Sequence, residues 1–227
     1  MAGYLVQINV ETRKLSLPKS LIPVALSDRR VFKNKFQEAI DVKRINYISS
    51  EEFQVSEDTL RRMIKKYSEQ AVYRPLDDIR YYFQYESRAF IEPGYPPLFY
   101  PVIQSGKSNQ KINISAISAI GEGVTGFLCQ RIYGCRKLTR PIQDGVDIIM
   151  TDNEKTYLVE AKGSTASDIF SFVQKLDDDY LTTIVRETLS ASGIDQRPVI
   201  GILMGVHLKD ESNYSCYITE IEIQVNQ

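Results

Sequence analysis

The feature that most constrains the fold is a pair of apolar segments joined by a short polar turn. The segments read GVDIIMT at 145–151 and TYLVEAKG at 156–163. Runs of this length and composition around a short turn predict two antiparallel strands. Because residues i and i+2 of a strand face the same side, Glu160 and Lys162 project together, and the hairpin register brings Asp147 opposite them. We therefore expect two carboxylates and one ammonium group at one place on a sheet.

Hydrophobic periodicity predicts a regular order of elements in the second half of the chain. Apolar residues recur at helical spacing over 114–132 and 167–191, and these segments are predicted helices. Strands are predicted near 135–140, 146–151, 156–162, 198–206 and 214–225. The resulting order is α-β-β-β-α-β-β, which is typical of an α/β protein.

A stretch rich in proline and glycine, 93–110, separates this half from the first. We place a boundary there, between an N-terminal part (1–110) and a core (111–227). The N-terminal part is expected to be mainly helical, with one short strand at 4–10. Its helices are predicted, from the N-terminal signals Ser27, Ser56 and Pro75, at 28–42, at 57–71 and from residue 75 onward.

The scarcity of histidine and cysteine excludes several kinds of catalytic site. The chain has one histidine, His207, and three cysteines. Zinc hydrolases and Ser–His triads need imidazoles that this chain lacks, so chemistry must come from carboxylates, lysines, hydroxyls and bound ions. Without a disulfide framework, a long apolar run or a leader-like N-terminus, we expect a cytoplasmic protein with no membrane partner.

A divalent cation would resolve the electrostatics of the predicted hairpin site. Two carboxylates at one spot repel each other and are costly to bury without a counter-charge. Their hard oxygens suit Mg²⁺, and Mn²⁺ can take its place. The ion would polarise a phosphoryl oxygen and lower the pKa of a bound water. Lys162 would then offset the charge that builds up on the phosphate in the transition state.

An acid-x-lysine triplet is a weak signal on its own. A second one, Asp41-Val42-Lys43, follows a predicted helix and has no upstream acid on a partner strand. The alternative interpretation of Asp147, Glu160 and Lys162 is a solvated ion pair on a hairpin, which stabilises a protein little. The strand context, the upstream aspartate and the following helix favour a catalytic site.

With these residues in place, the chain resembles the PD-(D/E)XK, or restriction-endonuclease-like, nuclease superfamily over about 111–227. Asp147, Glu160 and Lys162 match its motif, although Val146 stands where the family name has proline. The resemblance implies an αβββαβ core in which helices flank a central mixed sheet. It also implies a further acid on the first helix, here Glu122 within Gly121-Glu122-Gly123, and an ion ligand in the carbonyl group of Ala161. For Glu122 the alternative is an exposed helix acid.

Two basic runs on the helices predicted in the N-terminal part are candidates for contacts with DNA phosphates. Their members are Arg29, Arg30, Lys33 and Lys35 in the first run, and Arg61, Arg62, Lys65 and Lys66 in the second. Gln174, on the long helix after the site, could also touch substrate. The alternative for all of them is a solvated helix face, and the net charge of −1 does not by itself indicate a nucleic-acid partner.

Together these features predict a Mg²⁺-dependent DNA endonuclease that acts on double-stranded DNA. No phosphate-binding G-x-x-x-x-G-K-[ST] loop of a motor protein accompanies the core. A core with its own recognition part is most similar to a type II restriction enzyme, and such enzymes are usually homodimers. The N-terminal part would then recognise substrate or mediate dimerisation. A repair or mobile-element nuclease of the same chemistry, or a DNA-binding protein that keeps the fold without catalysis, remain alternatives.

Overall fold

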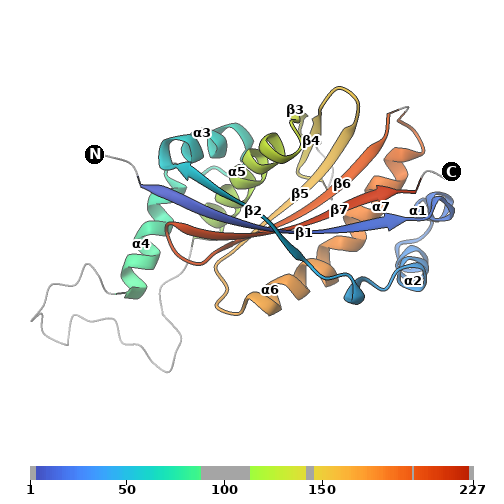
Figure 1. Cartoon of the computed structure of the whole chain (residues 1–227), viewed down its shortest axis with the longest axis horizontal. Helices are drawn as coiled ribbons and strands as arrows, with labels where there is room; N and C mark the ends of the chain where they lie inside the picture. Colours follow the sequence, from blue (N-terminus) through green and yellow to red (C-terminus); the bar gives the residue numbers. More distant parts are fainter. Residues whose placement is uncertain (1–3, 88–112, 142–145, 196, 225–227) are drawn as a thin grey trace, which may run out of the picture.

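The computed structural model describes residues 4–87, 113–141, 146–195 and 197–224 (Figure 1). Seven strands form one mixed sheet in the order β2-β1-β7-β6-β5-β4-β3. The strands are β1 (Leu5–Leu17), β2 (Ile48–Ser56), β3 (Arg136–Thr139), β4 (Ile148–Thr151), β5 (Thr156–Ser164), β6 (Val199–Leu208) and β7 (Asn213–Ile223). Two neighbouring pairs, β5 with β6 and β1 with β7, are parallel, and the other four are antiparallel.

Helices cover both faces of this sheet. The α-helices are α1 (Ile22–Ala25), α2 (Arg29–Ala39), α3 (Glu57–Tyr67), α4 (Pro75–Ser87), α5 (Ile114–Ile132), α6 (Ile169–Lys175) and α7 (Thr182–Ser192). Shorter helical segments are η1 (Lys19–Leu21), η2 (Val42–Arg44) and the π-helical η4 (Leu176–Leu181). Figure 1 shows α3, α4 and α5 grouped toward one end of the strands, and α1, α2 and α7 toward the other. The expected α/β class, with helices on both sides of a mixed sheet, is confirmed.

Strand β6 shows why there are two layers of helices. Its even-numbered side chains, such as Ile202 and Met204, belong to the core under α3, α4 and α5. Its odd-numbered Val199 and Leu203 belong to the second core, under α1, α2 and α7. Every residue of β6 is buried, as expected for a central strand covered on both faces. The apolar run that predicted this strand therefore reflects burial on both sides.

Close backbone packing fixes α5 against β5. A Cβ atom added at Gly163 would lie 2.4 Å from the carbonyl oxygen of Ile117, and one added at Gly121 would lie 3.0 Å from the nitrogen of Gly163. Real Cβ atoms do not approach backbone as closely as 2.4 Å, and 3.0 Å is tighter than most real contacts, so glycine lets helix and strand meet here. This contact lies directly beside Lys162, and it fixes the position of β5 relative to α5.

The expectation of a mainly helical N-terminal part was wrong. This part is organised around β1 and β2, which supply two of the seven strands. β1 continues to Leu17, well beyond the predicted 4–10, and β2 was not predicted at all. The reason is that most of β2 is exposed, so its sequence ISSEEFQVS shows no apolar alternation.

The boundary predicted near 110 lies outside the described residues. On either side of it, the two parts of the chain share one sheet, because β1 pairs with β7 along its length. The helix predicted over 167–191 is present as α6, η4 and α7 in succession. Its N-cap is Asp168, whose side chain accepts a hydrogen bond from the nitrogen of Phe170.

Candidate active site

Asp147 lies where β4 begins. Its backbone nitrogen donates to the carbonyl oxygen of Val159 (3.0 Å), and its side-chain Oδ2 accepts from the nitrogen of Ala161 (2.7 Å). The pairing of β4 with β5 ends at Ile148, which is the partner of Val159. Beyond that point, the Asp147 carboxylate accepts the hydrogen bond that a backbone carbonyl would accept if the pairing continued. This hydrogen bond fixes the Asp147 side chain against β5.

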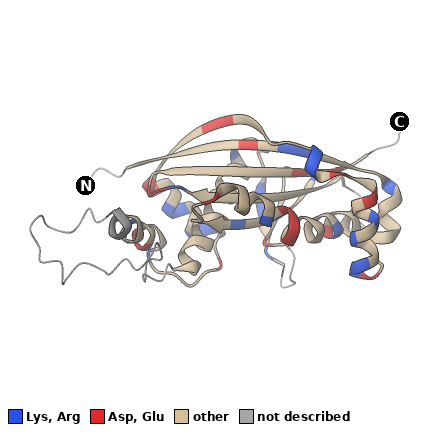
Figure 2. Cartoon of the chain, turned by 90° about the horizontal axis from the view of Figure 1, so that it is seen from below, with Lys and Arg blue, Asp and Glu red and all other residues tan. Residues whose placement is uncertain are grey.

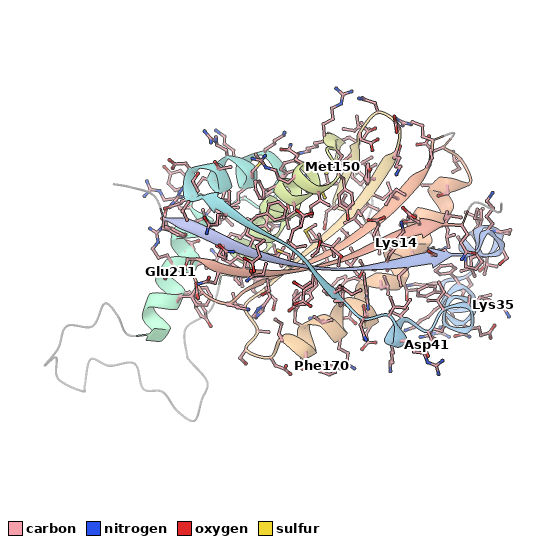
Figure 3. All side chains as sticks on the ribbon, viewed as in Figure 1. Lys14, Lys35, Asp41, Met150, Phe170 and Glu211 are labelled. Atoms are coloured by element: carbon pink, nitrogen blue, oxygen red, sulfur yellow. The ribbon has the colours of Figure 1, made fainter. Side chains whose placement is uncertain are left out.

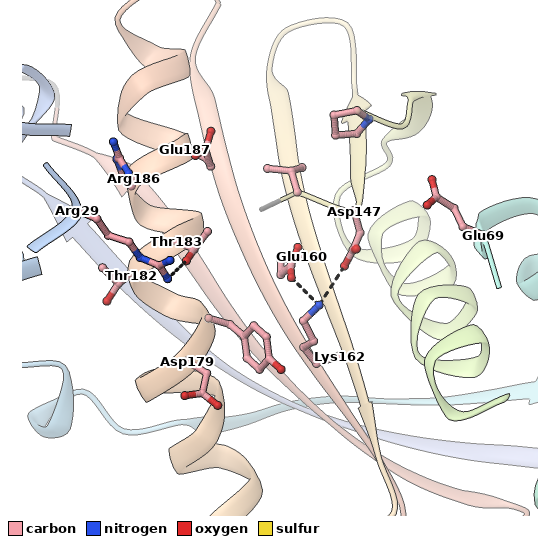
Figure 4. A pocket seen from close by; sticks show the side chains of 13 residues that line it. Arg29, Glu69, Asp147, Glu160, Lys162, Asp179, Thr182, Thr183, Arg186 and Glu187 are labelled. Atoms are coloured by element: carbon pink, nitrogen blue, oxygen red, sulfur yellow. Dashed lines mark hydrogen bonds and ion pairs between the residues drawn. The ribbon is translucent and has the colours of Figure 1, made fainter. Parts of the chain in front are cut away.

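Glu160 and Lys162 project from β5 on the face that carries Asp147 (Figure 4). The ammonium nitrogen of Lys162 lies 2.6 Å from Oε1 of Glu160 and 3.8 Å from Oδ2 of Asp147. Leu158, two residues before Glu160 on the same face, belongs to the core under α7, so the trio faces that layer of helices. The structure thus brings together the three residues that the hairpin register predicted to converge.

Burial and mutual charge perturb this group. Burial, followed by the charge of Asp147, raises the pKa of Glu160 to about 7. For Lys162, burial favours the neutral amine, but the charges of Asp147 and Glu160 outweigh it and raise the pKa. Perturbed carboxylate and amine groups held together in a cavity are typical of functional sites. A site of this charge favours an added cation.

The trio lines a cavity of about 600 Å³. Its lining residues are Arg29, Glu69, Pro141, Val146, Asp147, Glu160, Lys162, Asp179, Tyr180, Thr182, Thr183, Arg186 and Glu187. Arg29 comes from the start of α2, and Glu69 follows the end of α3. The first basic run therefore reaches the cavity through Arg29. The segment that follows the second run reaches it through an acidic residue, Glu69.

Tyr180 is a site residue that the sequence analysis missed. It projects from η4, and its ring centroid lies 4.8 Å from the ammonium nitrogen of Lys162. Regular helical spacing assigned Tyr180 to the apolar face of one long helix. The π-helical turn changes that spacing, and such turns often occur at functional sites.

Glu122 lies on α5 outside the lining of this cavity. It is nearly fully buried, and Arg140 (2.6 Å), the backbone nitrogen of Glu69 (2.9 Å) and Gln70 (3.3 Å) bind its carboxylate. Arg140 also binds the side chain of Glu69 (2.7 Å), which lines the cavity. Glu122 thus reaches the site indirectly, through Arg140 and Glu69.

The donor set for a metal ion is small. Within the described ranges, no group of three or more His, Cys, Asp and Glu side chains is placed to hold a metal ion. Five carboxylate residues line the cavity, and of these Asp147 and Glu160 are the pair held against Lys162. The Ala161 carbonyl was the further ligand implied by the resemblance. Mg²⁺ commonly binds one or two carboxylates and keeps several waters, so this pair fits such an ion.

The two basic helices lie on opposite faces of the sheet. Phe32 of α2 belongs to the core under α7, whereas Leu60 and Ile64 of α3 belong to the core under α5. Figure 2 shows lysines and arginines interspersed with acidic residues along helices and strands. The two runs therefore do not form one continuous basic face.

Within the first run, only Arg29 lines the cavity, where its Nη2 donates to Oγ1 of Thr183 (3.3 Å). Arg30, Lys33 and Lys35 are exposed, and Lys35 pairs with Glu38 (2.8 Å) at the outer surface of α2 (Figure 3). The second acid-x-lysine triplet, which begins at Asp41, also lies in this region, away from Met150 of the hairpin (Figure 3).

Within the second run, Arg61 has a structural role. It pairs with Glu57 (2.5 Å) and Asp77 (2.8 Å), which ties α3 to α4. Arg62, Lys65 and Lys66 are exposed on α3, and Gln174 is exposed on α6 outside the cavity lining.

Comparison of the chain with protein-family models, with curated proteins and with solved structures finds no match. Among the described helices, none combines the length and apolar composition needed to cross a bilayer.

Proposed function

We propose that this chain is a Mg²⁺-dependent DNA endonuclease that hydrolyses phosphodiester bonds. The observation that carries the proposal is the convergence of Asp147, Glu160 and Lys162 on one face of the β4–β5 hairpin, at the wall of a cavity. Two acids, each within 4 Å of the same amine and held there by a sheet, match the needs of metal-assisted phosphoryl chemistry.

The order of elements supports the resemblance to PD-(D/E)XK nucleases. α5, the β3–β4–β5 meander, the α6–α7 segment and β6 follow one another along the chain, with β6 parallel to β5. Asp147 directly precedes the second strand of the meander, and Glu160 and Lys162 lie on the third. Membership of that superfamily is part of this proposal.

Asp147, Glu160 and Lys162 would have different roles in hydrolysis. Asp147 and Glu160 would hold the ion, which supplies Lewis-acid activation of phosphate and water. Lys162, held between the two carboxylates, would contact a non-bridging oxygen of the scissile phosphate and offset its growing negative charge. A water oxygen bonds to phosphorus, one P–O ester bond breaks, and the departing oxygen takes up a proton. The products are a phosphate monoester and an alcohol.

Within this chemistry, a type II restriction-type enzyme working as a homodimer on double-stranded DNA is our specific proposal. A repair or mobile-element nuclease would use the same site on other substrates. A DNA-binding protein without catalysis would keep the cavity and Arg29 but would not need the pKa of Glu160 to be raised.

Incubation of the purified chain with supercoiled plasmid and Mg²⁺, with EDTA as the control, tests the proposal. Discrete fragments that require Mg²⁺ would support a restriction-type enzyme, and a metal-dependent smear would support a nuclease without strict sequence preference. Plasmid that remains intact with Mg²⁺ and with Mn²⁺, across substrates of varied sequence, would reject the nuclease.

A further inference from the structure

Two lysines from distant parts of the chain each lie near the ring of one aromatic residue, Tyr67. Lys66 lies in the last turn of α3, and Lys137 lies on β3. Their ammonium nitrogens are 5.1 Å and 5.9 Å from the ring centroid of Tyr67. Lys137 also donates to the carbonyl oxygen of Lys66 (3.1 Å). We call Lys66, Tyr67 and Lys137 the α3–β3 patch.

The charges of this patch are not balanced locally. In the part of the chain that the structure describes, no carboxylate lies within ion-pair distance of Lys66 or Lys137. Nearby Arg61 and Arg140, by contrast, are each held by two acids. Arg140 and Lys66 repel the charge of Lys137, and Glu69 and Glu122 attract it from beyond ion-pair distance, so a bound anion would add a direct counter-charge.

Burial is the larger cost for the charge of Lys137. Burial, followed by the charge of Arg140, lowers the pKa of Lys137. An ammonium group has three N–H donors, and the Lys66 carbonyl takes one of them. An anionic oxygen that binds the others would relieve both the repulsion and the desolvation.

The patch is connected to the cavity. Arg140 follows Lys137 by three residues and binds Glu69, which lines the cavity. Pro141, the next residue, also lines it. A chain of phosphates that leaves the cavity on the α3 side would therefore pass over Lys66 and Lys137.

We propose that the α3–β3 patch binds the phosphate backbone of DNA next to the scissile phosphate. This inference rests on the proposed function, because it takes DNA as the ligand of the cavity. The patch supplies affinity without base recognition, since its donors are two ammonium groups, each near a buried ring. The proposal adds Lys137 to the DNA-contacting residues predicted from sequence. It removes Arg61, which Glu57 and Asp77 hold.

The test is the salt dependence of DNA binding by the full chain in EDTA, where metal-dependent cleavage does not occur. Each phosphate contact that is lost reduces the slope of log Kobs against log salt concentration by about 1. The double variant Lys66→Ala/Lys137→Ala should reduce the slope by roughly 1–2 and weaken binding alike on unrelated DNA sequences. Lys66→Arg/Lys137→Arg keeps both charges and should bind with the original slope.

Lys209→Ala is the matched control, because this exposed lysine lies in the turn between β6 and β7. It should leave the slope unchanged. A wild-type slope in the folded double alanine variant, with its melting temperature checked, would overturn the patch. If wild-type protein cleaves DNA while that slope is unchanged, the proposed function stands and the patch fails. If the slope falls but no variant or wild-type protein cleaves DNA, the patch stands and the nuclease fails.

Discussion

The ring of Tyr180 lies against the ammonium group of Lys162, with Nζ 4.8 Å from the ring centroid. Tyr180 comes from η4, whereas Lys162 comes from β5, so this contact joins a helical layer to the sheet at the site. The aromatic face attracts the ammonium group and helps to hold it in the cavity, but it does not neutralise the charge as a carboxylate would.

Removal of the ring should therefore slow cleavage. A cation–π contact contributes about 0.5–2 kcal/mol, so Tyr180→Leu should reduce single-turnover cleavage by up to about 30-fold. Tyr180→Phe keeps the ring and should retain most of the rate. Comparison of the two variants at saturating DNA separates the ring from the hydroxyl. Equal losses of cleavage rate in both variants would show that the contact between the ring and Lys162 does not contribute to cleavage.

The raised pKa of Glu160 predicts a pH-dependent loss of stability in the metal-free protein. The folded-state pKa is about 7 against an ordinary value of 4.5, so the folded protein binds more protons than the unfolded chain between these values. Stability should therefore fall as pH rises through this window and stay low above about pH 7, by an amount on the order of 1–3 kcal/mol.

Glu160→Gln should remove that loss. Its melting temperature, measured without metal, should exceed that of the wild type at pH 8, and the difference should shrink toward pH 5. Mg²⁺ should raise the melting temperature of the wild type at pH 8 more than that of the variant. A difference between the two proteins that does not change with pH would contradict the assigned pKa.

The position of η4 should depend on a buried ion pair behind it. Arg13 on β1, with a side chain only 3% exposed, binds both oxygens of Asp177 in η4, and it also donates to Thr219 (2.9 Å). Arg13→Met should destabilise the protein by about 3–5 kcal/mol, because Asp177 loses its counter-charge. The double variant Arg13→Met/Asp177→Leu should recover most of this loss in urea unfolding. A double variant as unstable as the single one would show that the charge of Asp177 is not the cause.

The helix–strand contact beside the site predicts a strong effect of a single methyl group. Gly163→Ala places a Cβ atom 2.4 Å from the Ile117 carbonyl oxygen, so α5 must shift, at a cost of roughly 1–3 kcal/mol. Gly193→Ala is the control, because its nearest neighbour would be 3.4 Å away. Urea unfolding should separate the two variants, and equal stabilities would contradict this account of the packing.

Most of the second half of the fold could be predicted from the sequence, because its periodicity is strong. The helix predicted over 114–132 is α5, and the five predicted strands are β3 to β7. β2 could not be predicted, since an edge strand that is exposed over most of its length has no apolar pattern. The pairing of β1 with β7 could not be predicted either, because it joins segments about 200 residues apart, and local pattern carries no information on such contacts.

The candidate site was predictable only where its residues share a local element. The hairpin register placed Asp147 opposite Glu160 and Lys162 because the three residues lie on adjacent strands. Tyr180 and Arg29 reach the cavity from other layers, so their place depends on tertiary packing. Periodicity also could not show that Arg61 is held by Glu57 and Asp77, or that Arg140 holds Glu122.

The most direct measurement of the central claim is single-turnover cleavage of a labelled duplex in Mg²⁺ by the wild type and by Lys162→Ala, with DNA affinity measured in parallel. The duplex should be one that the wild type cleaves in the plasmid assay. We expect the variant to bind DNA with near wild-type affinity and to lose roughly 10²–10³-fold or more in rate, because it removes stabilisation of the transition state only. A folded Lys162→Ala protein that cleaves at the wild-type rate would contradict the account.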